Sequence, residues 1–294
     1  MVYSIVKKIL ILGHTGFIGQ NILAKLTGKK LNVAGLSTDD INLESEKSVG
    51  TLTKYLSSET VLIITVAVNR ELGDNLENLG KNIRIISNIA KAIGKKKLLK
   101  CVYLSTADVY GRPTNKITER SSIDPKTYYA TAKFCCEKIL QITTQVNGIP
   151  YLILRYNGIW GPGQKNLGYG INAFIKGIIN DRMVTIWGSG REYRDSLYVK
   201  DLAAVIIQLT LSRHTGVFNI AKGESSTFLK MIKILYKLSP IKFKILKRER
   251  TSPKFDQKFD ISKLKKALPN LIFTPTEDAV SETFNFLKKQ GTRT

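Results

Sequence analysis

The fold of this chain is decided by one stretch near its beginning, Ile9-Leu10-Ile11-Leu12-Gly13-His14-Thr15-Gly16-Phe17-Ile18-Gly19. Four apolar residues, typical of a buried parallel strand, lead directly into a glycine turn, and a helical pattern from about Phe17 to Leu26 follows. A dinucleotide-binding loop requires this order, because glycines let the backbone approach a pyrophosphate and a helix N-terminus offers N–H groups to it. The spacing is GxxGxxG and not GxGxxG, so the turn taken alone is equally typical of a plain connection.

The rest of the first half repeats this alternation of apolar runs and helical patterns. Predicted strands cover 31–36, 61–68, 99–104 and 151–156, and predicted helices cover 83–93 and 128–146. The alternation predicts an α/β fold, a Rossmann-type doubly wound parallel sheet. Beyond Tyr156 glycines and Pro162 break the pattern. We therefore expect an NAD(P)-binding domain over 1–156, rejoined by a segment near 197–215, and a smaller α/β substrate-binding domain over 157–294.

The composition indicates a globular protein of one large or two modest domains, with 294 residues, 43% hydrophobic and 23% charged. No apolar run approaches the length of a membrane span, and the first run is too short for a signal-peptide core. Cys101, Cys135 and Cys136 form no CxxC and have no histidine cluster nearby. We therefore expect no metal site, no disulfide framework and no membrane partner, and a reducing cytoplasmic location.

The net charge of +23 raises the hypothesis of a nucleic-acid partner. The most basic segment, 242–266, holds ten basic and three acidic residues but contains no recognisable nucleic-acid-binding motif. A lysine-rich background is therefore the favoured interpretation. Attraction to phosphate-bearing ligands is compatible with either interpretation.

Tyr129 and Lys133 lie four residues apart, on one face of the predicted helix 128–146. An ammonium group and a pyridinium ring beside a phenol lower its pKa toward the working range of a general base. Such pairs are also common on exposed helix faces. Ser105 and Thr106 end the preceding predicted strand, where ligands bind in parallel sheets, and this favours the functional interpretation.

The acidic residue that usually ends the second strand of a dinucleotide-binding fold is missing. Ser37 and Thr38 occupy that place, and Asp39 and Asp40 follow. Neither an acid that favours NAD nor an arginine that favours NADP is present, so the choice of cofactor stays open. Asp40 is interpreted either as a neighbour of the adenine or as a turn-forming residue.

Three motifs stand in order along the chain: Gly13-x-x-Gly16-x-x-Gly19, Leu104-Ser-Thr-Ala-Asp-Val-Tyr-Gly111 and Tyr129-x-x-x-Lys133. Together they resemble those of the extended short-chain dehydrogenase/reductase family, the NAD-dependent epimerases and dehydratases that modify nucleotide-sugars. Further matches are Leu154-Arg-Tyr-Asn-Gly-Ile-Trp-Gly-Pro-Gly163, Gly188-x-Gly190, Arg194-Asp-Ser-Leu-Tyr-Val-Lys-Asp-Leu-Ala203 and Phe259-Asp-Ile-Ser-Lys-Leu264. They follow the family's order along nearly the whole chain.

The resemblance implies that Tyr129 is the catalytic acid or base, that Lys133 lowers its pKa and binds ribose, and that Thr106 bonds the reacting sugar oxygen. Implied cofactor contacts are Gly13, Thr15, Gly16, Phe17, Ile18, Gly19, Ser37, Asp40, Ala67, Asn78, Tyr129, Lys133 and Tyr156. Helix capping is the alternative for Asn78. Implied substrate contacts are Thr106, Asp108, Asn157, Trp187 and Arg194. For Arg194 the proposed ligand is the diphosphate, with a salt bridge to Asp195 or Asp201 as the alternative.

Two departures from the family pattern narrow the expected reaction. Dehydratases of the family place Asp-Glu after the catalytic threonine, where this chain has Ala107 and Asp108, so a general acid is missing and a dehydratase is disfavoured. Many epimerases have an asparagine two residues after the tyrosine at 156, whereas Asn157 comes one residue early and Gly158 takes its place. The identity of the substrate is therefore left open.

The sequence thus favours an NAD(P)-dependent 4-epimerase or 4-keto reductase acting on a nucleoside-diphosphate sugar, as in surface-polysaccharide precursor synthesis. The rival from another class is a catalytically inactive Rossmann-fold sensor or nucleic-acid-binding protein that uses the +23 charge. By resemblance the chain forms a homodimer through the helices 83–93 and 128–146.

Overall fold

The computed structural model describes residues 6–29, 31–113, 115–164, 170–250 and 253–291. Its largest sheet has six parallel strands in the order β10-β5-β4-β3-β1-β2. Their bounds are β1 Lys8–Leu12, β2 Asn32–Leu36, β3 Thr60–Ile64, β4 Lys100–Thr106, β5 Tyr151–Tyr156 and β10 Gly216–Ile220. The expected α/β fold with a doubly wound parallel sheet is confirmed.

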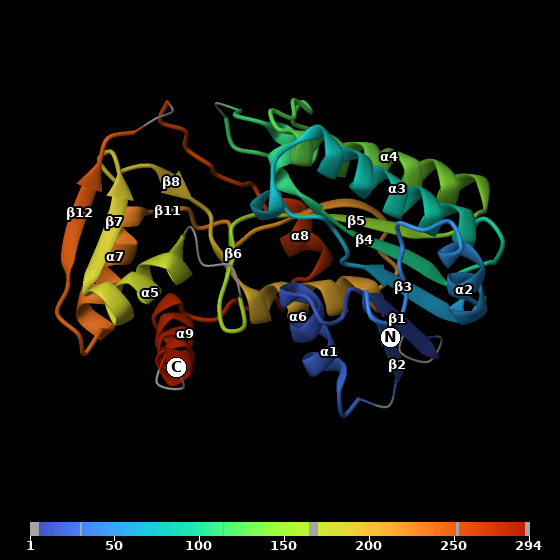
Figure 1. Ribbon diagram of the computed structural model, residues 1–294, viewed down its shortest axis with the longest axis horizontal. Helices are drawn as coiled ribbons and strands as arrows, with labels where there is room; N and C mark the ends of the chain where they lie inside the picture. Colours follow the sequence, from blue (N-terminus) through green and yellow to red (C-terminus); the bar gives the residue numbers. More distant parts are fainter. Residues whose placement is uncertain (1–5, 30, 114, 165–169, 251–252, 292–294) are drawn as a thin grey trace.

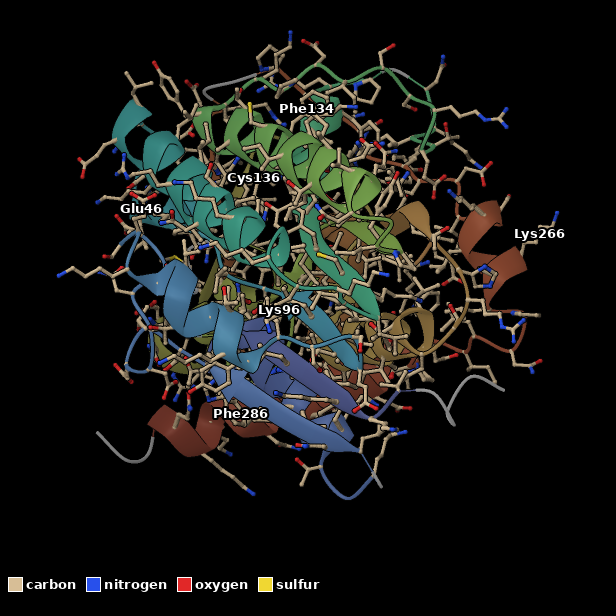
Figure 2. The ribbon with its side chains drawn as sticks, turned by 90° about the vertical axis from the view of Figure 1, so that its right-hand side faces the viewer. Glu46, Lys96, Phe134, Cys136, Lys266 and Phe286 are labelled. Carbon is tan, nitrogen blue, oxygen red and sulfur yellow. The ribbon has the colours of Figure 1, made fainter. Side chains whose placement is uncertain are left out.

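Helices cover both faces of this sheet (Figure 1). One face carries α1 (Phe17–Leu26) and α6 (Val199–Thr210), and the other carries α2 (Ser48–Tyr55), α3 (Leu76–Ile93) and α4 (Tyr128–Val146). Figure 2 shows α3 and α4 side by side, with Cys136 on α4. Because side chains alternate along a strand, Ile9 and Ile11 join the core under α1 and α6, whereas Leu10 and Leu12 join the core under α3 and α4.

A second lobe lies at the left of Figure 1 and has its own core. It contains α5 (Ile171–Asp181), β7 (Met183–Trp187), α7 (Phe228–Leu238), β12 (Lys244–Arg248) and α9 (Thr276–Gly291). β12 pairs in parallel with β7, and the short strands β8 (Tyr193–Arg194) and β11 (Ser226–Thr227) pair with each other. β6 (Ile159–Trp160) pairs with β9 (Leu197–Tyr198) where the chain passes between the lobes. α8 (Ser262–Ala267) packs near β10.

Several predicted elements differ from the observed ones at their ends. The predicted strand 61–68 stops at Ile64. The amide of Asn82 bonds both the N–H and the carbonyl of Val68, which takes the place of strand pairing. The predicted helix 83–93 begins earlier, at Leu76, because the Asn75 side chain caps its N-terminus. The predicted helix 128–146 and the predicted strand 151–156 have the expected bounds.

The chain returns to the large sheet after leaving it. α6 packs on α1, and β10 adds to the edge of the sheet next to β5. Among the described residues, no helix combines the length and the apolar character that crossing a membrane would require.

Candidate active site

The glycine loop after β1 is held close to the ends of the neighbouring strands. Gly13 has a φ of 86°, and a Cβ there would lie 2.7 Å from the Thr65 hydroxyl oxygen. That hydroxyl donates to the carbonyls of Leu12 and Gly13 at 2.7 and 3.0 Å. A Cβ at Gly19 would lie 2.1 Å from the Gly13 carbonyl oxygen. Only glycine therefore fits at 13 and 19 in this loop.

The first turn of α1 presents a positive end to this loop. Gly16 is the N-cap and supplies no side-chain cap, and no acidic residue stands in the first turn. The N-terminal N–H groups and the helix dipole at Phe17 and Ile18 suit an anion such as a pyrophosphate. Thr15 lies exposed on the loop. The residues present thus fit a dinucleotide.

The end of β2 is shaped by a turn between Ser37 and Asp40. The Asp40 carboxylate accepts hydrogen bonds from the Ser37 N–H at 2.7 Å and from its hydroxyl at 2.9 Å. These bonds lower the pKa of Asp40. Asp40 thus forms the turn that the sequence analysis gave as the alternative to an adenine contact. The turn places its carboxylate beside Ser37, at the end of β2, where the usual acidic residue is missing. The Nδ1 atom of His14, on the glycine loop, is buried without a hydrogen-bond partner.

Ala67 lies in the segment after β3, and Asn78 lies in the first turn of α3. The side-chain amide of Asn82 joins this segment to α3. Ala67 is half-buried in the segment after β3, which Asn82 anchors at Val68. Asn78 does not cap α3; its amide donates to the carbonyls of Leu72 and Gly73 at 3.1 and 2.9 Å. Asn78 thereby fixes the short helix η1 (Arg70–Leu72), and its contact with a cofactor stays a prediction.

The ends of β4 and β5 bring together the polar residues predicted for catalysis. Thr106 and Tyr156 are register partners in this strand pair. The Thr106 hydroxyl accepts a hydrogen bond from the N–H of Asp108 at 3.1 Å and caps the short helix η2 (Ala107–Tyr110). Burial raises the pKa of Asp108, and the charge of Arg70 opposes that rise.

Tyr129 stands in the first turn of α4, beside these residues. Burial raises its pKa well above the ordinary value, and the charge on Asp108 and a hydrogen bond with Tyr156 add to the rise. Burial also raises the pKa of Tyr156 to about 12. In the protein alone the phenol of Tyr129 is therefore protonated at neutral pH, as a proton donor would be.

Lys133 lies one turn further along α4 and is buried against β4. Its ammonium donates to the Leu104 carbonyl at 2.7 Å and lies 4.2 Å from the centre of the Tyr103 ring. Burial lowers the pKa of Lys133 to about 8. Lys100, which is bonded to backbone carbonyls away from the site, has the same lowered pKa, so the place of Lys133 beside the end of β4 and not its pKa connects it with the site.

Two residues of this site were missed by the sequence reasoning. Arg70, on η1, is exposed, and its positive charge offsets part of the rise in the pKa of both Asp108 and Tyr129. Asp74 accepts a hydrogen bond from the backbone N–H of Tyr129 at 2.9 Å. Both residues lie in the 70–74 segment, which carries no sequence motif. Their contact with the site therefore becomes visible only in the folded structure, where this segment meets the start of α4.

The predicted substrate residues are divided between the two lobes. Asn157 is buried, and its amide donates to the Asp195 carbonyl at 2.7 Å, so this bond serves to join β5 to the 195–198 segment. Trp187 ends β7, is 42% exposed and lies under the Arg248 guanidinium, 5.7 Å from it. Substrate contacts of both residues stay predictions.

Arg194 is held by backbone and by aromatic rings. Its guanidinium donates to the carbonyls of Tyr193 and Phe255 and lies over the rings of Phe228 and Phe255. The alternative salt bridge is not formed: the Asp195 carboxylate accepts from the N–H groups of 222 and 223, and the Asp201 carboxylate accepts from Thr274.

Two cavities of about 350 and 360 Å³ lie in the second lobe, and Phe228 lines both. Trp187 lines the first and Arg194 the second. Their volumes lie at the lower end of the range typical of ligand pockets, about 300–1,000 Å³. Within the described ranges, no group of three or more histidine, cysteine or acidic side chains is arranged to hold a metal ion.

Comparison with known proteins places this geometry in a family. The model of the NAD dependent epimerase/dehydratase family matches residues 9–221. The Uncharacterized UDP-glucose epimerase YtcB of Bacillus subtilis (strain 168) is 26% identical, over 95% of this chain and 98% of its own length. A dTDP-4-dehydro-6-deoxyglucose reductase of Escherichia coli is also 26% identical, over 77% of this chain and 80% of its own.

Solved structures share the fold. The UDP-N-acetylglucosamine 4-epimerase from Methanobrevibacter ruminantium M1, in complex with UDP-N-acetylmuramic acid, has a TM-score of 0.82 and 25% identity, covering 97% of this chain and 99% of that one. RMD from Pseudomonas aeruginosa, complexed with NADPH, has a TM-score of 0.87 and 18% identity, with the same coverage. The residues that the family model matches include the glycine loop after β1, Thr106 at the end of β4, and Tyr129 and Lys133 on α4. This chain therefore belongs to the NAD dependent epimerase/dehydratase family of enzymes.

Proposed function

We propose that this enzyme catalyses NAD(P)-dependent hydride transfer at a sugar carbon of a nucleoside-diphosphate sugar, as a 4-epimerase or a 4-keto reductase. The proposal rests on one arrangement: Thr106, Asp108, Tyr129 and Tyr156 meet at the carboxyl ends of β4 and β5, at the sheet edge that also holds the glycine loop. In open α/β sheets this edge is where ligands bind. The pathway we propose is surface-polysaccharide precursor synthesis.

When NAD or NADP is bound, it supplies the acceptor or donor of the hydride. The glycines at 13, 16 and 19 and the N-terminus of α1 would hold the pyrophosphate. Ser37 and Asp40 follow the end of β2, where they would face the adenosine ribose, and the carboxylate of Asp40 would repel a 2′-phosphate, which supports NAD.

Proton movement on the sugar oxygen falls to Tyr129. Its raised pKa in the protein alone suits the protonated form, which gives its proton to a carbonyl oxygen in a reductase. The reverse transfer requires a positive charge nearby. In the protein alone Arg70 is a cation whose charge acts to lower the pKa of Tyr129. We propose that Lys133, one turn along α4, adds to this effect when the cofactor is bound, and the ring of a bound NAD(P)+ would contribute a further positive charge. The Thr106 hydroxyl donates to the same sugar oxygen and orients it.

Water elimination is not favoured by this site. The position after Thr106 is Ala107, which is buried and has no ionisable group. Asp108 has a raised pKa, but it has no acidic neighbour at 107 to share the two proton transfers.

The test is Tyr129→Phe, assayed for turnover of nucleotide-sugars and for NAD binding by calorimetry. We expect turnover to fall by about a hundredfold to ten-thousandfold, as for the loss of an acid–base group, while cofactor affinity is unchanged. Lys138→Met, on the exposed face of the same helix, is the control and should leave both quantities intact. Unchanged turnover in Tyr129→Phe would exclude the mechanism.

Epimerase and reductase differ in how they use the cofactor. An epimerase regenerates its cofactor in each cycle, so the purified enzyme should release roughly stoichiometric oxidised NAD on denaturation, seen by mass spectrometry and absence of 340 nm absorbance. A reductase should bind added NADPH or NADH reversibly and consume it. We further propose a homodimer formed through α3 and α4, which sedimentation would test.

A further inference from the structure

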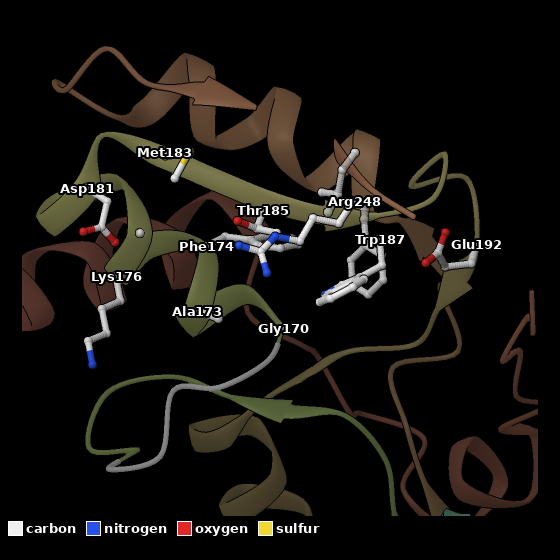
Figure 3. Close-up of a pocket in the computed structure, with 13 residues that line it drawn as sticks. Gly170, Ala173, Phe174, Lys176, Asp181, Met183, Thr185, Trp187, Glu192 and Arg248 are labelled. Carbon is white, nitrogen blue, oxygen red and sulfur yellow. The ribbon is translucent and has the colours of Figure 1, made fainter. Parts of the chain in front are cut away.

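The cavity beside Trp187 is lined by residues of α5 and β7, by Arg248 of β12, by Phe228 of α7 and by Glu192, which precedes β8 (Figure 3). Phe174 and Phe228 contribute apolar wall, and the ring of Trp187 stands at the end of β7 with the Arg248 guanidinium over it. Aromatic faces of this kind suit a flat heterocycle, and a base can stack on Trp187 without hydrogen-bond readout. Stacking alone does not select among bases.

Glu192 adds an element that can select. It lines the same cavity and is only 3% exposed. One carboxylate oxygen, Oε1, forms an ion pair with the Arg250 guanidinium at 2.8 Å. The other oxygen, Oε2, is buried and has no hydrogen-bond partner. A buried carboxylate oxygen without a donor costs free energy that a donating ligand restores.

The chemistry of the bases decides which ligand can do this. A carboxylate oxygen only accepts hydrogen bonds, and it pairs with exocyclic amino groups such as N4 of cytosine. Uracil and thymine carry a carbonyl oxygen at that place. The one donor on their base, N3–H, lies between two carbonyl oxygens, and a carboxylate repels both of them. Arg250 neutralises part of the charge on Glu192 but, bonded to Oε1 and to the Trp187 carbonyl at 3.1 Å, leaves Oε2 as an acceptor.

We propose that Glu192 makes this cavity selective for a nucleobase with an exocyclic amino group, as in cytosine, guanine and adenine, over uracil and thymine. The inference rests on the proposed function, because it assigns the cavity to the base of the nucleoside-diphosphate sugar. It goes further by naming the residue that chooses the base and the feature of the base that is read.

Two pairs of nucleotides isolate the amino group. CDP differs from UDP at the amino-bearing edge, and GDP differs from IDP only by the 2-amino group. Titration calorimetry on the full-length protein should show that CDP binds about tenfold or more tightly than UDP, or GDP than IDP, as expected for a hydrogen bond to a charged group. ADP, UDP and dTDP complete the panel.

The variant Glu192→Gln replaces the acceptor by an amide that both donates and accepts. We expect its preference ratio to fall to near one. Asp181→Asn changes another carboxylate lining the cavity, an exposed one, and should keep the ratio of the unmodified protein. Arg250→Met removes the ion pair but keeps the carboxylate, and should also keep the preference.

The ratio in the unmodified protein tests the inference even where Glu192→Gln does not fold. No preference within either pair, or a preference for UDP, would overturn it while leaving hydride transfer by Tyr129 untouched. A ratio that persists in a folded Glu192→Gln would remove Glu192 as its cause. Failure of every nucleoside diphosphate to bind would overturn the proposed function as well.

Discussion

The Asp74 carboxylate accepts a hydrogen bond of 2.9 Å from the backbone N–H of Tyr129, and so ties the segment after β3 to the first turn of α4. The same turn is capped from within by Thr127, whose hydroxyl accepts from the N–H of Ala130 at 3.1 Å. The bond from Thr127 is local, whereas the bond to Asp74 comes from a part of the chain 55 residues away. The bond to Asp74 also holds the 70–74 segment so that the charge of Arg70 acts on Asp108 and Tyr129.

Asp74→Ala should therefore reduce activity more than stability. Loss of a cap costs about 1 kcal/mol, and Thr127→Ala should cost a similar amount. Only Asp74→Ala releases the 70–74 segment from Tyr129, so we expect its kcat/KM to fall about tenfold or more below that of Thr127→Ala. Urea unfolding and steady-state kinetics on both variants measure the difference, and equal kcat/KM values would contradict it.

Gly19→Ala should abolish cofactor binding, because its Cβ would lie 2.1 Å from the Gly13 carbonyl oxygen and force the loop to move. The matched control is Gly50→Ala on α2, where a Cβ meets nothing within 4 Å. Alanine in a helix is favoured over glycine by about 1 kcal/mol, so Gly50→Ala should be neutral or stabilising. NAD titration followed by fluorescence compares the two variants. Normal NAD binding by Gly19→Ala would contradict the role of the glycine loop in holding the cofactor.

Arg70→Ala should shift the pH dependence of the reaction. The positive charge of Arg70 lowers the pKa of Asp108, so its removal raises that pKa. Asp108 then protonates at higher pH, and the acid limb of the kcat/KM profile should move upward. Arg84→Ala, an exposed arginine of α3, is the control. An acid limb that coincides for Arg70→Ala and the unmodified protein would count against this account.

The two buried lysines, Lys133 and Lys100, should each contribute stability that increases between about pH 8 and 10 in the protein without cofactor. Burial lowers the pKa of Lys133 and of Lys100 to about 8, below the value of about 10.4 in the unfolded chain. At these two lysines the unfolded chain holds more protons in this window, so their contribution to stability increases with pH, by on the order of 2 kcal/mol for each lysine. Burial raises the pKa of the Cys101 and Cys136 thiols to about 12 and about 11, so these thiols oppose the lysine contribution in the same window. Raised tyrosine pKa values, such as that of Tyr129, oppose it above about pH 10.

Urea unfolding at pH 7.5, 8.5 and 9.5 of the unmodified protein and of Lys133→Met measures the contribution of Lys133 as the difference between the two slopes of stability against pH. The slope should be lower in Lys133→Met, because methionine fills a similar volume without a charge, while the contribution of Lys100 remains. Lys138→Met, an exposed site on the same helix, should leave the slope as it is. A slope unaffected by Lys133→Met would mean that the buried ammonium is not the source.

A buried ion pair under the site offers a stability test. Arg155 and Glu137 are 6% and 2% exposed and lie 2.6 Å apart, and Glu137 also accepts from Ser105 at 2.5 Å. Removing one partner of a buried pair costs about 3–5 kcal/mol. We expect Arg155→Met and Glu137→Met each to cost this much in urea unfolding, and the double variant to cost less than the sum. Strict additivity would show that the two charges do not depend on each other.

The sequence by itself determined five strands of the sheet, the glycine loop and the Tyr129–Lys133 pair, whereas β10 was not predicted. Each depends on local order: four apolar residues, a glycine turn and a helical pattern are neighbours in the chain, and Tyr129 and Lys133 share a helix face through its period. The bounds of α1 and α4 follow from the same pattern. The fold class could be predicted because these signals repeat along the first half.

Only the tertiary structure decided which distant residues complete the site. Arg70 and Asp74 come to Tyr129 because Asn78 and Asn82 fold the segment after β3 away from the sheet. Glu192 meets Arg250 because β12 pairs with β7, far away in sequence. Such contacts join side chains that are far apart in the sequence and belong to no motif or periodic pattern. They form, and stabilise the protein, only once the helices and strands have packed together.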